Sequence, residues 1–247
     1  MLSKAQLKIY RSLQQKKFRD QLGLFLAEGP KCVDELRSVF RLEALITEEE
    51  VGRVAIEQLS SLRTPQGVIG VFHKPEPSEI ENQKSKIENL TLALDGIQDP
   101  GNLGTIIRTC DWFGVREIFC SLDTADCYSP KVVQATMGAL ARVRIHYVDL
   151  PAWLQSQIEN RKSKIEIFGT LLDGRNMYDE LSTIDYRLST NSIIVMGNEG
   201  NGISSAVRSL ITHPLFIPSY PPGEPTSESL NVAIATAIVL AEFRRPH

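Results

Sequence analysis

The segment LALDGIQDPGNLGTIIRTCDWFGV at residues 92–115 decides how most of this chain folds. It begins as an apolar strand, turns at residues 99–101, and continues as a helix that opens at Asn102. Asn102 and Arg108 lie in or just after this turn, where a parallel sheet positions its ligands. The turn is therefore the first candidate for an active site.

Strand and helix patterns alternate from Leu90 onward. Alternation of this kind predicts an α/β fold, a mainly parallel sheet with helices on both faces. The expected strands lie at 90–94, 117–120, 143–148, 165–170, 192–196 and 214–217, and the helical patterns near 102–113, 129–140, 151–160, 203–210 and 229–243. Ligands should gather at the carboxyl ends of these strands.

The first 75 residues indicate a separate, smaller α/β unit. Its expected strands lie at 23–27, 42–46 and 67–72, and its helices begin at Pro30 and Val54. A polar stretch with prolines follows and has little to bury. The sequence therefore predicts a first domain over 1–75, a linker over 76–89 and a second domain over 90–247.

The composition is that of an ordinary globular protein, with 42% apolar and 23% charged residues. A net charge of -3 gives no overall attraction to nucleic acid, so only a local basic patch can provide one. No apolar run approaches the roughly 20 residues of a membrane span, and the N-terminus lacks the apolar core of a signal peptide. We expect a cytoplasmic protein that does not enter a membrane.

The cysteines do not suggest a metal site. Cys32, Cys110, Cys120 and Cys127 show no CxxC spacing, and the four histidines do not complete a ligand set with them. We expect reduced, mostly buried thiols and no metal.

The first 19 residues are basic and contain no acid. Their charged side chains are Lys4, Lys8, Arg11, Lys16, Lys17 and Arg19. A helix would place Lys4, Lys8 and Arg11 on one face. The neighbouring face would be apolar and carry Ala5, Ile9 and Leu13. Such a basic face is either a solvated surface or a site of contact with RNA phosphates.

Three glycine-bearing loops follow strands of the second domain, at 99–104, 197–202 and 218–231. Glycines after a strand are usually simple turn residues. Each of these loops also carries polar residues that a plain turn does not need. These are Asn102 with Arg108, Asn198 with Glu199, and Ser229 with Asn231. The conjunction of three such loops indicates one binding site.

The pattern Asn102-x-Gly104-x-x-x-Arg108, with MGNEGNG at 196–202 and SLNVAIA at 229–235, resembles the three motifs of a known family. This is the SpoU (TrmH-like) branch of the SPOUT RNA 2'-O-ribose methyltransferases. The stretch at 16–36 is similar to the substrate-binding domain, of ribosomal-protein-L30e-like fold, that precedes the catalytic domain in many members.

This resemblance implies an S-adenosylmethionine-dependent enzyme that methylates a ribose in structured RNA, with ribosomal RNA favoured over transfer RNA. It also implies a deep trefoil knot in the second domain and a homodimer. The residues implied for catalysis are Arg108, Asn102, Glu199, Ser229 and Asn231. The residues implied for cofactor contact, largely through backbone groups, are Thr170, Leu171, Met196, Gly197, Asn198, Gly200, Ile217 and Leu230. The six basic residues at 4–19 are then the RNA-binding set.

Arg108 is the essential residue of the family that this chain resembles. An arginine with its ordinary pKa above about 12 does not take a proton at neutral pH. We therefore expect Arg108 to orient a phosphate and stabilise a developing alkoxide. Asn102, Ser229 and Asn231 would shape the pocket, and Glu199 would fix Arg108 or its neighbours.

Two departures from the family pattern stand out. The segment PSYPPGEPTSE at 218–228 is longer and richer in proline than the compact loop typical of ribosomal-RNA members, so the cofactor rim is expected to be reshaped. Cys110 stands where a small alanine is usual, and it should pack as a small hydrophobe.

Two other functions compete with methyl transfer. The first is an RNA-binding protein that has lost catalysis, against which the five implied catalytic residues are all present. The second is a dinucleotide-binding oxidoreductase, but the first loop lacks the GxGxxG pattern after its strand.

Overall fold

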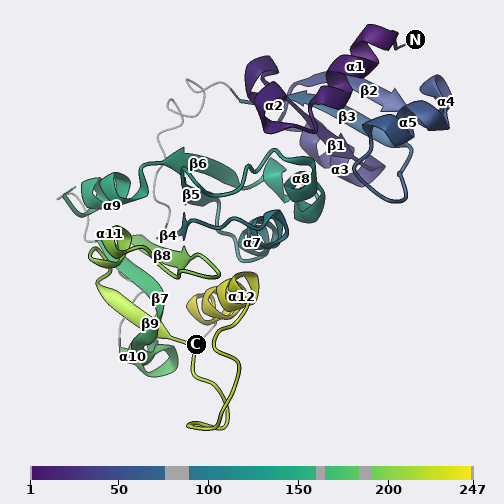
Figure 1. The fold of residues 1–247 in the computed structure, drawn as a ribbon. Helices are drawn as coiled ribbons and strands as arrows, with labels where there is room; N and C mark the ends of the chain where they lie inside the picture. The colour runs from purple at the N-terminus through teal and green to yellow at the C-terminus, as the bar shows by residue number, and fades with distance from the viewer. Residues whose placement is uncertain (1, 76–88, 160–164, 184–190, 246–247) are drawn as a thin grey trace. The chain divides into compact units, whose positions relative to one another are not determined.

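The computed structural model describes residues 2–75, 89–159, 165–183 and 191–245 (Figure 1). Two compact units make up the chain, Met1–Ser85 with Asp126–Arg142, and Lys86–Ala125 with Val143–His247. The segment Asp126–Arg142, which the sequence assigned to the second domain, therefore packs with the first unit. The predicted linker lies outside the described residues except for Asn89.

The first unit is built on a three-stranded antiparallel sheet in the order β1–β3–β2. Its strands are β1 (Leu24–Glu28), β2 (Leu42–Thr47) and β3 (Val68–His73). Its helices are α1 (Lys4–Ser12), α2 (Lys16–Leu22), α3 (Pro30–Arg37), α4 (Glu48–Val51), α5 (Arg53–Leu59) and α8 (Pro130–Thr136), and a 3-10 turn follows at Ala139–Ala141. All three strands lie within one residue of their predicted positions.

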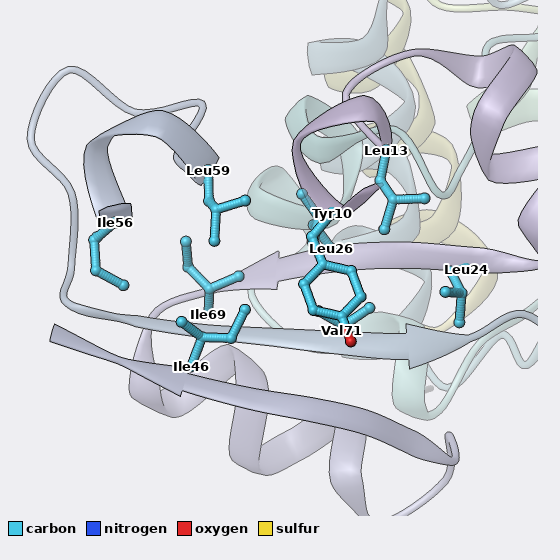
Figure 2. Packing of buried hydrophobic residues seen from close by; sticks show 9 residues of the cluster. All are labelled: Tyr10, Leu13, Leu24, Leu26, Ile46, Ile56, Leu59, Ile69 and Val71. Atoms are coloured by element: carbon cyan, nitrogen blue, oxygen red, sulfur yellow. The ribbon is translucent and has the colours of Figure 1, made fainter. Parts of the chain in front are cut away.

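Helices α1 and α5 cover one face of this sheet and form its apolar core (Figure 2). The core side chains are Tyr10, Leu13, Leu24, Leu26, Ile46, Ile56, Leu59, Ile69 and Val71. Burying a large apolar side chain of this kind contributes roughly 1.5–3 kcal/mol. The predicted apolar face of α1 is confirmed at Leu13, which is buried, and is wrong at Ala5 and Ile9, which are exposed. Tyr10 packs into the core instead of Ile9.

The opposite face of the sheet is aromatic. Because strand side chains alternate, Phe25 points away from Leu24 and Leu26. The Phe25 ring stacks on Phe72 with centroids 5.7 Å apart and lies 4.9 Å from the ring of Tyr128. Tyr128 belongs to the segment Asp126–Arg142, and burial raises the pKa of its hydroxyl well above the ordinary value. This aromatic contact is one reason why that segment packs with the first unit.

A buried ion pair is the second reason. Arg19 is 3% exposed, and its Nη2 donates to Asp126 Oδ2 at 2.7 Å. Its Nη1 donates to the backbone oxygens of Leu13 and Gln14 at 2.8 and 3.0 Å. The guanidinium is thus enclosed by acceptors. The prediction that Arg19 binds RNA is wrong, since this side chain is buried and paired.

Replacing Arg19 with Met should lower the free energy of unfolding of the first unit by about 3–5 kcal/mol, because it leaves the buried Asp126 carboxylate without a positively charged partner. Equilibrium denaturation measures this loss. Adding Asp126→Leu should recover part of it, since no buried charge then remains. Lys16→Ala is the control, because the Lys16–Asp20 pair is exposed and should change stability by less than about 1 kcal/mol. A loss in Arg19→Met no larger than in this control would contradict the role given to the pair.

The second unit is a six-stranded sheet in the order β6–β5–β4–β8–β7–β9, and every pairing in it is parallel. Its strands are β4 (Asn89–Asp95), β5 (Glu117–Ser121), β6 (Arg144–Val148), β7 (Ile165–Asn176), β8 (Asn191–Gly197) and β9 (His213–Phe216). Its helices are α7 (Pro100–Trp112), α9 (Leu150–Glu159), α10 (Met177–Thr183), α11 (Ser205–Arg208) and α12 (Val232–Phe243). The predicted parallel α/β fold is confirmed.

Helices cover both faces of this sheet. On one face, Ala93, Ile193 and Val195 pack with Leu154 of α9 and Val207 of α11. On the other face, α7 and α12 pack against each other and α12 contacts β8 (Figure 1). Among the described residues, none of the helices has the length and apolar content needed to cross a bilayer.

The centre of the sheet sets the position of the site. Strands β4 and β8 pair along their whole length, from Asn89 opposite Asn191 to Asp95 opposite Gly197. The loops that follow the two strands therefore start level with each other at the carboxyl edge of the sheet. This is where a parallel sheet binds its ligands.

Candidate active site

A cavity of about 520 Å³ lies in the second unit, at the carboxyl ends of β8 and β9 and beside Thr170, Leu171 and Leu172 in the middle of β7. All eight residues predicted to contact a cofactor line it: Thr170, Leu171, Met196, Gly197, Asn198, Gly200, Ile217 and Leu230. Glu199 and Ser229 of the predicted catalytic set line it as well. The structure therefore brings together residues that are far apart in the sequence.

Some lining residues were missed by the sequence reasoning. Leu215, Phe216, Val232 and Ala235 belong to the cavity, as do Ser219, Tyr220 and Thr226 through Glu228. The first four are apolar positions of β9 and α12, and nothing in the sequence distinguishes them from core residues. The others fall in the segment 218–228, whose unusual length was the only signal.

The floor of the cavity requires glycine at position 197. A Cβ atom there would lie 2.5 Å from the carbonyl carbon of Gly202 and from the nitrogen of Ile203. The loop closes tightly because the backbones of Asn198 and Gly202 exchange two hydrogen bonds of 2.9 Å. The close approach of the two backbones leaves no room for a side chain.

The side chain of Asn198 forms hydrogen bonds to the backbone of two loops. Its Nδ2 donates to the backbone oxygen of Gly96 at 2.6 Å, and its Oδ1 accepts from the nitrogens of Gly200 and Asn201 at 2.9 and 3.0 Å. The side chain thus ties the loop after β8 to the loop after β4. Both bonds accepted by Oδ1 come from the loop itself, so the amide oxygen is not available to a cofactor.

A chain of hydrogen bonds joins the three motif loops. Asn231 Nδ2 donates to Asn102 Oδ1 at 2.9 Å, and Asn102 Nδ2 donates to Glu199 Oε1 at 2.7 Å. The Oδ1 atom of Asn231 accepts from the backbone nitrogens of Ala233 and Ile234, which caps α12. Because backbone N–H groups only donate, this cap fixes both amide orientations and makes Glu199 the final acceptor.

The N-terminus of α7 is built to hold Asn102 in this chain. Asp99 caps the helix by accepting from the backbone nitrogen of Asn102 at 2.8 Å, and Pro100 occupies the first turn. The helix begins at Pro100, two residues before the predicted start, because Asp99 and Pro100 favour a helix N-terminus. A Glu199 carboxylate beside this terminus is also favoured by the helix dipole.

Arg108 lies on the exposed side of α7, after Asn102. Its guanidinium makes no hydrogen bond or ion pair with any described residue, and it does not line the cavity. The expected contact between Glu199 and Arg108 is absent among the described residues, and Glu199 holds the neighbouring Asn102 instead. Arg108 is therefore free to bind an anionic group from outside the unit.

Cys110 packs on the buried side of the same helix. It has no exposed surface, and burial raises the pKa of its thiol. The expectation that it packs as a small hydrophobe is confirmed. The other three cysteines are also buried and reduced, as predicted.

A parallel sheet with a cavity at its carboxyl edge, and amides from three loops hydrogen-bonded at that edge, is the architecture of an α/β enzyme. The chain belongs to the SpoU rRNA methylase family, whose model matches residues 89–241. A second family model, the MRM3-like substrate binding domain, matches residues 4–55. The resemblance found in the three motifs is therefore confirmed.

Known proteins resemble the chain over nearly its whole length. The Bacillus subtilis 23S rRNA (guanosine(2553)-2'-O)-methyltransferase RlmP is 28% identical, with 96% of this chain and 95% of the relative covered. A TrmH-family structure from Porphyromonas gingivalis is 39% identical, with a TM-score of 0.81 and coverage of 99% and 98%. An AdoMet-bound rRNA methyltransferase from Sinorhizobium meliloti is 30% identical, with a TM-score of 0.82 and coverage of 99% and 96%.

Replacing Gly197 with Ala should lower the free energy of unfolding by about 1–3 kcal/mol, because the new Cβ overlaps backbone atoms that cannot move aside. Denaturant unfolding measures the change. Gly200→Ala is the matched control in the same loop, since its Cβ would meet only Asn198 Oδ1 at 3.5 Å. Its expected change is within about 0.5 kcal/mol. Equal effects of the two substitutions would show that close approach is not what selects Gly197.

Proposed function

We propose that this protein transfers a methyl group from S-adenosylmethionine to the 2'-hydroxyl of a ribose in ribosomal RNA. The observation that carries the proposal is the hydrogen-bond chain from Asn231 through Asn102 to Glu199, which unites the three family motifs beside one cavity. Relatives named as 23S ribosomal RNA methyltransferases support ribosomal over transfer RNA.

The cavity suits the cofactor. Its volume of about 520 Å³ is ordinary for a small-molecule site. Its inner wall offers apolar side chains such as Leu171 and Met196 to an adenine ring, and Gly197 and Gly200 leave backbone groups accessible. We assign cofactor contact to the eight predicted lining residues. When bound, S-adenosylmethionine supplies an electrophilic methyl carbon.

The residues of the chain orient the acceptor. A ribose hydroxyl is a weak nucleophile, so it must be held in line with the methyl group and its developing charge stabilised. Arg108 remains protonated, orients a substrate phosphate and stabilises the developing alkoxide. Asn102 is a positioning residue whose amide is fixed on both sides by Glu199 and Asn231. Ser229 contributes an exposed hydroxyl to the cavity wall.

Replacing Arg108 with Ala should lower the turnover number about 10²–10³-fold, because it removes a donor aimed at developing charge. Transfer of label from S-adenosylmethionine to ribosomal RNA measures turnover, and calorimetry should show that cofactor affinity is kept. Arg116→Ala is the control, since Arg116 is already paired with Asp111 at 2.7 Å. Label found only in transfer RNA, or on a base instead of a ribose, would contradict the proposal. So would full activity in Arg108→Ala.

The first unit supplies the RNA contacts in this proposal. Lys8 and Arg11 line a groove of about 750 Å³ between α1 and α5, together with polar side chains that include Gln14 and Gln58. Lys4, Lys8, Arg11 and Lys17 are exposed and form no ion pair with described residues, whereas Lys16 pairs with Asp20. The match to a substrate binding domain over residues 4–55 supports the same role. We therefore retain all of the predicted basic residues except Arg19.

The double variant Lys8→Ala/Arg11→Ala should raise the KM for ribosomal RNA and leave the cofactor affinity unchanged. Each lost phosphate contact should make the slope of log K against log salt shallower by about 0.7–0.9. A salt titration of RNA affinity measures this slope. Arg37→Ala is the control, because Arg37 is exposed on α3 but lies beside Asp34. An unchanged slope in the double variant would mean that this face is only a solvated surface.

The homodimer, the trefoil knot and the L30e-like fold of the first unit belong to the same proposal. Trp112 on α7 is 85% exposed, and Ile234 is exposed on the adjoining α12, which supports a second copy packing over these two helices. The chain after β9, at one edge of the sheet, returns to its middle to pack α12 against β8, as a knotted path requires.

A further inference from the structure

The segment between β9 and α12 carries an aromatic ring that the proposed chemistry does not use. Tyr220 lines the cavity, yet it is 92% exposed and contacts no described ring or hydrogen-bonding group. Residues 220–231 are all exposed, and the segment projects from the unit as a long loop (Figure 1). An aromatic side chain held in water at the rim of a cavity is a candidate binding surface.

The backbone next to Tyr220 is restrained. The nitrogen of Glu224 donates to the oxygen of Pro221 at 3.3 Å, which closes a four-residue turn. Pro222 and Gly223 are its central residues, and Gly223 has the φ of 81° that a type II turn needs at its third position. Prolines at 218 and 225 restrict the flanking backbone further. The ring is thus presented by a turn that loses little conformational entropy when a ligand binds.

The ring of Tyr220 lies at the cavity in which the proposed reaction takes place. Both ends of the segment, Ile217 and Leu230, line the same cavity. Leu172 and Leu230 are further large apolar side chains that are exposed and line it. A ribose delivered to this cavity brings its base and neighbouring bases to the same rim.

The charge of the segment excludes one mode of contact. Residues 217–231 contain Glu224 and Glu228 and no basic residue. The segment therefore offers phosphates no cation, and base faces and hydroxyl groups are the parts of RNA that its side chains suit. Unpaired RNA bases stack on exposed aromatic side chains in this way.

We propose that Tyr220 is a stacking platform for an unpaired base of the substrate RNA beside the reacting ribose. This inference rests on the proposed function, because it takes RNA as the molecule that enters the cavity. Tyr220 would thereby favour target sites in loops or bulges over fully paired helices. The inner residues of the cavity, and not this ring, would hold the adenine of the cofactor.

Binding of two RNA probes to the cofactor-loaded protein tests the inference. The probes are a short single-stranded oligoadenylate and an RNA duplex of equal length, followed by fluorescence anisotropy. Tyr220→Ala should weaken binding of the single strand about 5- to 150-fold, the range that loss of one stacked base implies. Duplex binding should not change. Tyr220→Phe should bind as the unchanged protein does, because the ring and not the hydroxyl makes the contact.

Tyr178→Ala is the matched control. Tyr178 is 44% exposed on α10 in the same unit but does not line the cavity. Its loss should leave both affinities unchanged. Because both tyrosines are largely exposed, neither substitution should unfold the protein, which a thermal scan verifies.

Three outcomes would overturn the inference. They are an unchanged single-strand affinity in Tyr220→Ala, an equal loss in Tyr178→Ala, and a loss of S-adenosylmethionine affinity in calorimetry with RNA affinity kept. The last outcome would assign the ring to the cofactor. Probe binding needs no turnover, so failure of the proposed methyl transfer appears separately, as absence of label in ribosomal RNA.

Discussion

The parallel pairing of β4 with β8 is the constraint on which the second unit depends. It aligns Asp95 with Gly197, so the two loops that follow begin side by side. Asn198 then reaches Gly96, and Ser204 donates its backbone N–H to Asp95 at 2.7 Å. A shift of register by one residue would turn the side chains of either strand toward the opposite helical layer and move Asp95 out of line with Gly197. The pairing of the two central strands therefore fixes the relative positions of the first two loops of the site.

The third loop is positioned by a different means. It belongs to no strand pair at the centre of the sheet, and it reaches the other two through α12, which packs against α7. The cap of α12 on Asn231 fixes this amide, and Asn102 transmits its orientation to Glu199. Helix packing and helix capping thus complete what strand pairing begins. The guanidinium of Arg108 forms no hydrogen bond or ion pair with any described residue, so this chain does not hold it in place.

The sequence predicted the ends of every strand to within one residue except for β7, which continues to Asn176 instead of ending at 170. Buried strands are apolar runs bounded by turn residues, so the sequence marks them clearly. It predicted less where tertiary contacts decide. The helix expected over 129–140 ends at Thr136, because Met137 and Gly138 have positive φ values of 52° and 91°. Methionine rarely adopts a positive φ, so the sequence does not predict this backbone conformation. The burial of Arg19 was equally hidden, because its partner Asp126 lies 107 residues away.

The site was predicted as a set of residues but not as an arrangement. Motif spacing identified the loops, yet it did not reveal that Glu199 accepts from Asn102, since that depends on side-chain orientation. Motif spacing also did not distinguish the roles of Asn198 and Gly197. The amide of Asn198 bonds to the loop after β4, whereas Gly197 is required because a side chain would not fit there. The sequence showed only that the segment at 218–228 is longer and richer in proline than the usual loop of the family. It did not indicate which type of turn the segment contains.

The segment Asp126–Arg142 makes the first unit discontinuous along the chain. A fragment that starts at residue 90 would carry this segment without the helices and strands it packs with. It would leave Tyr128 without Phe25 and Asp126 without Arg19. A fragment of the second unit that begins at residue 90 therefore still contains Asp126–Arg142, which is part of the first unit. The exchange of the first unit for another domain in evolution would need compensating changes at residues 126–142 as well.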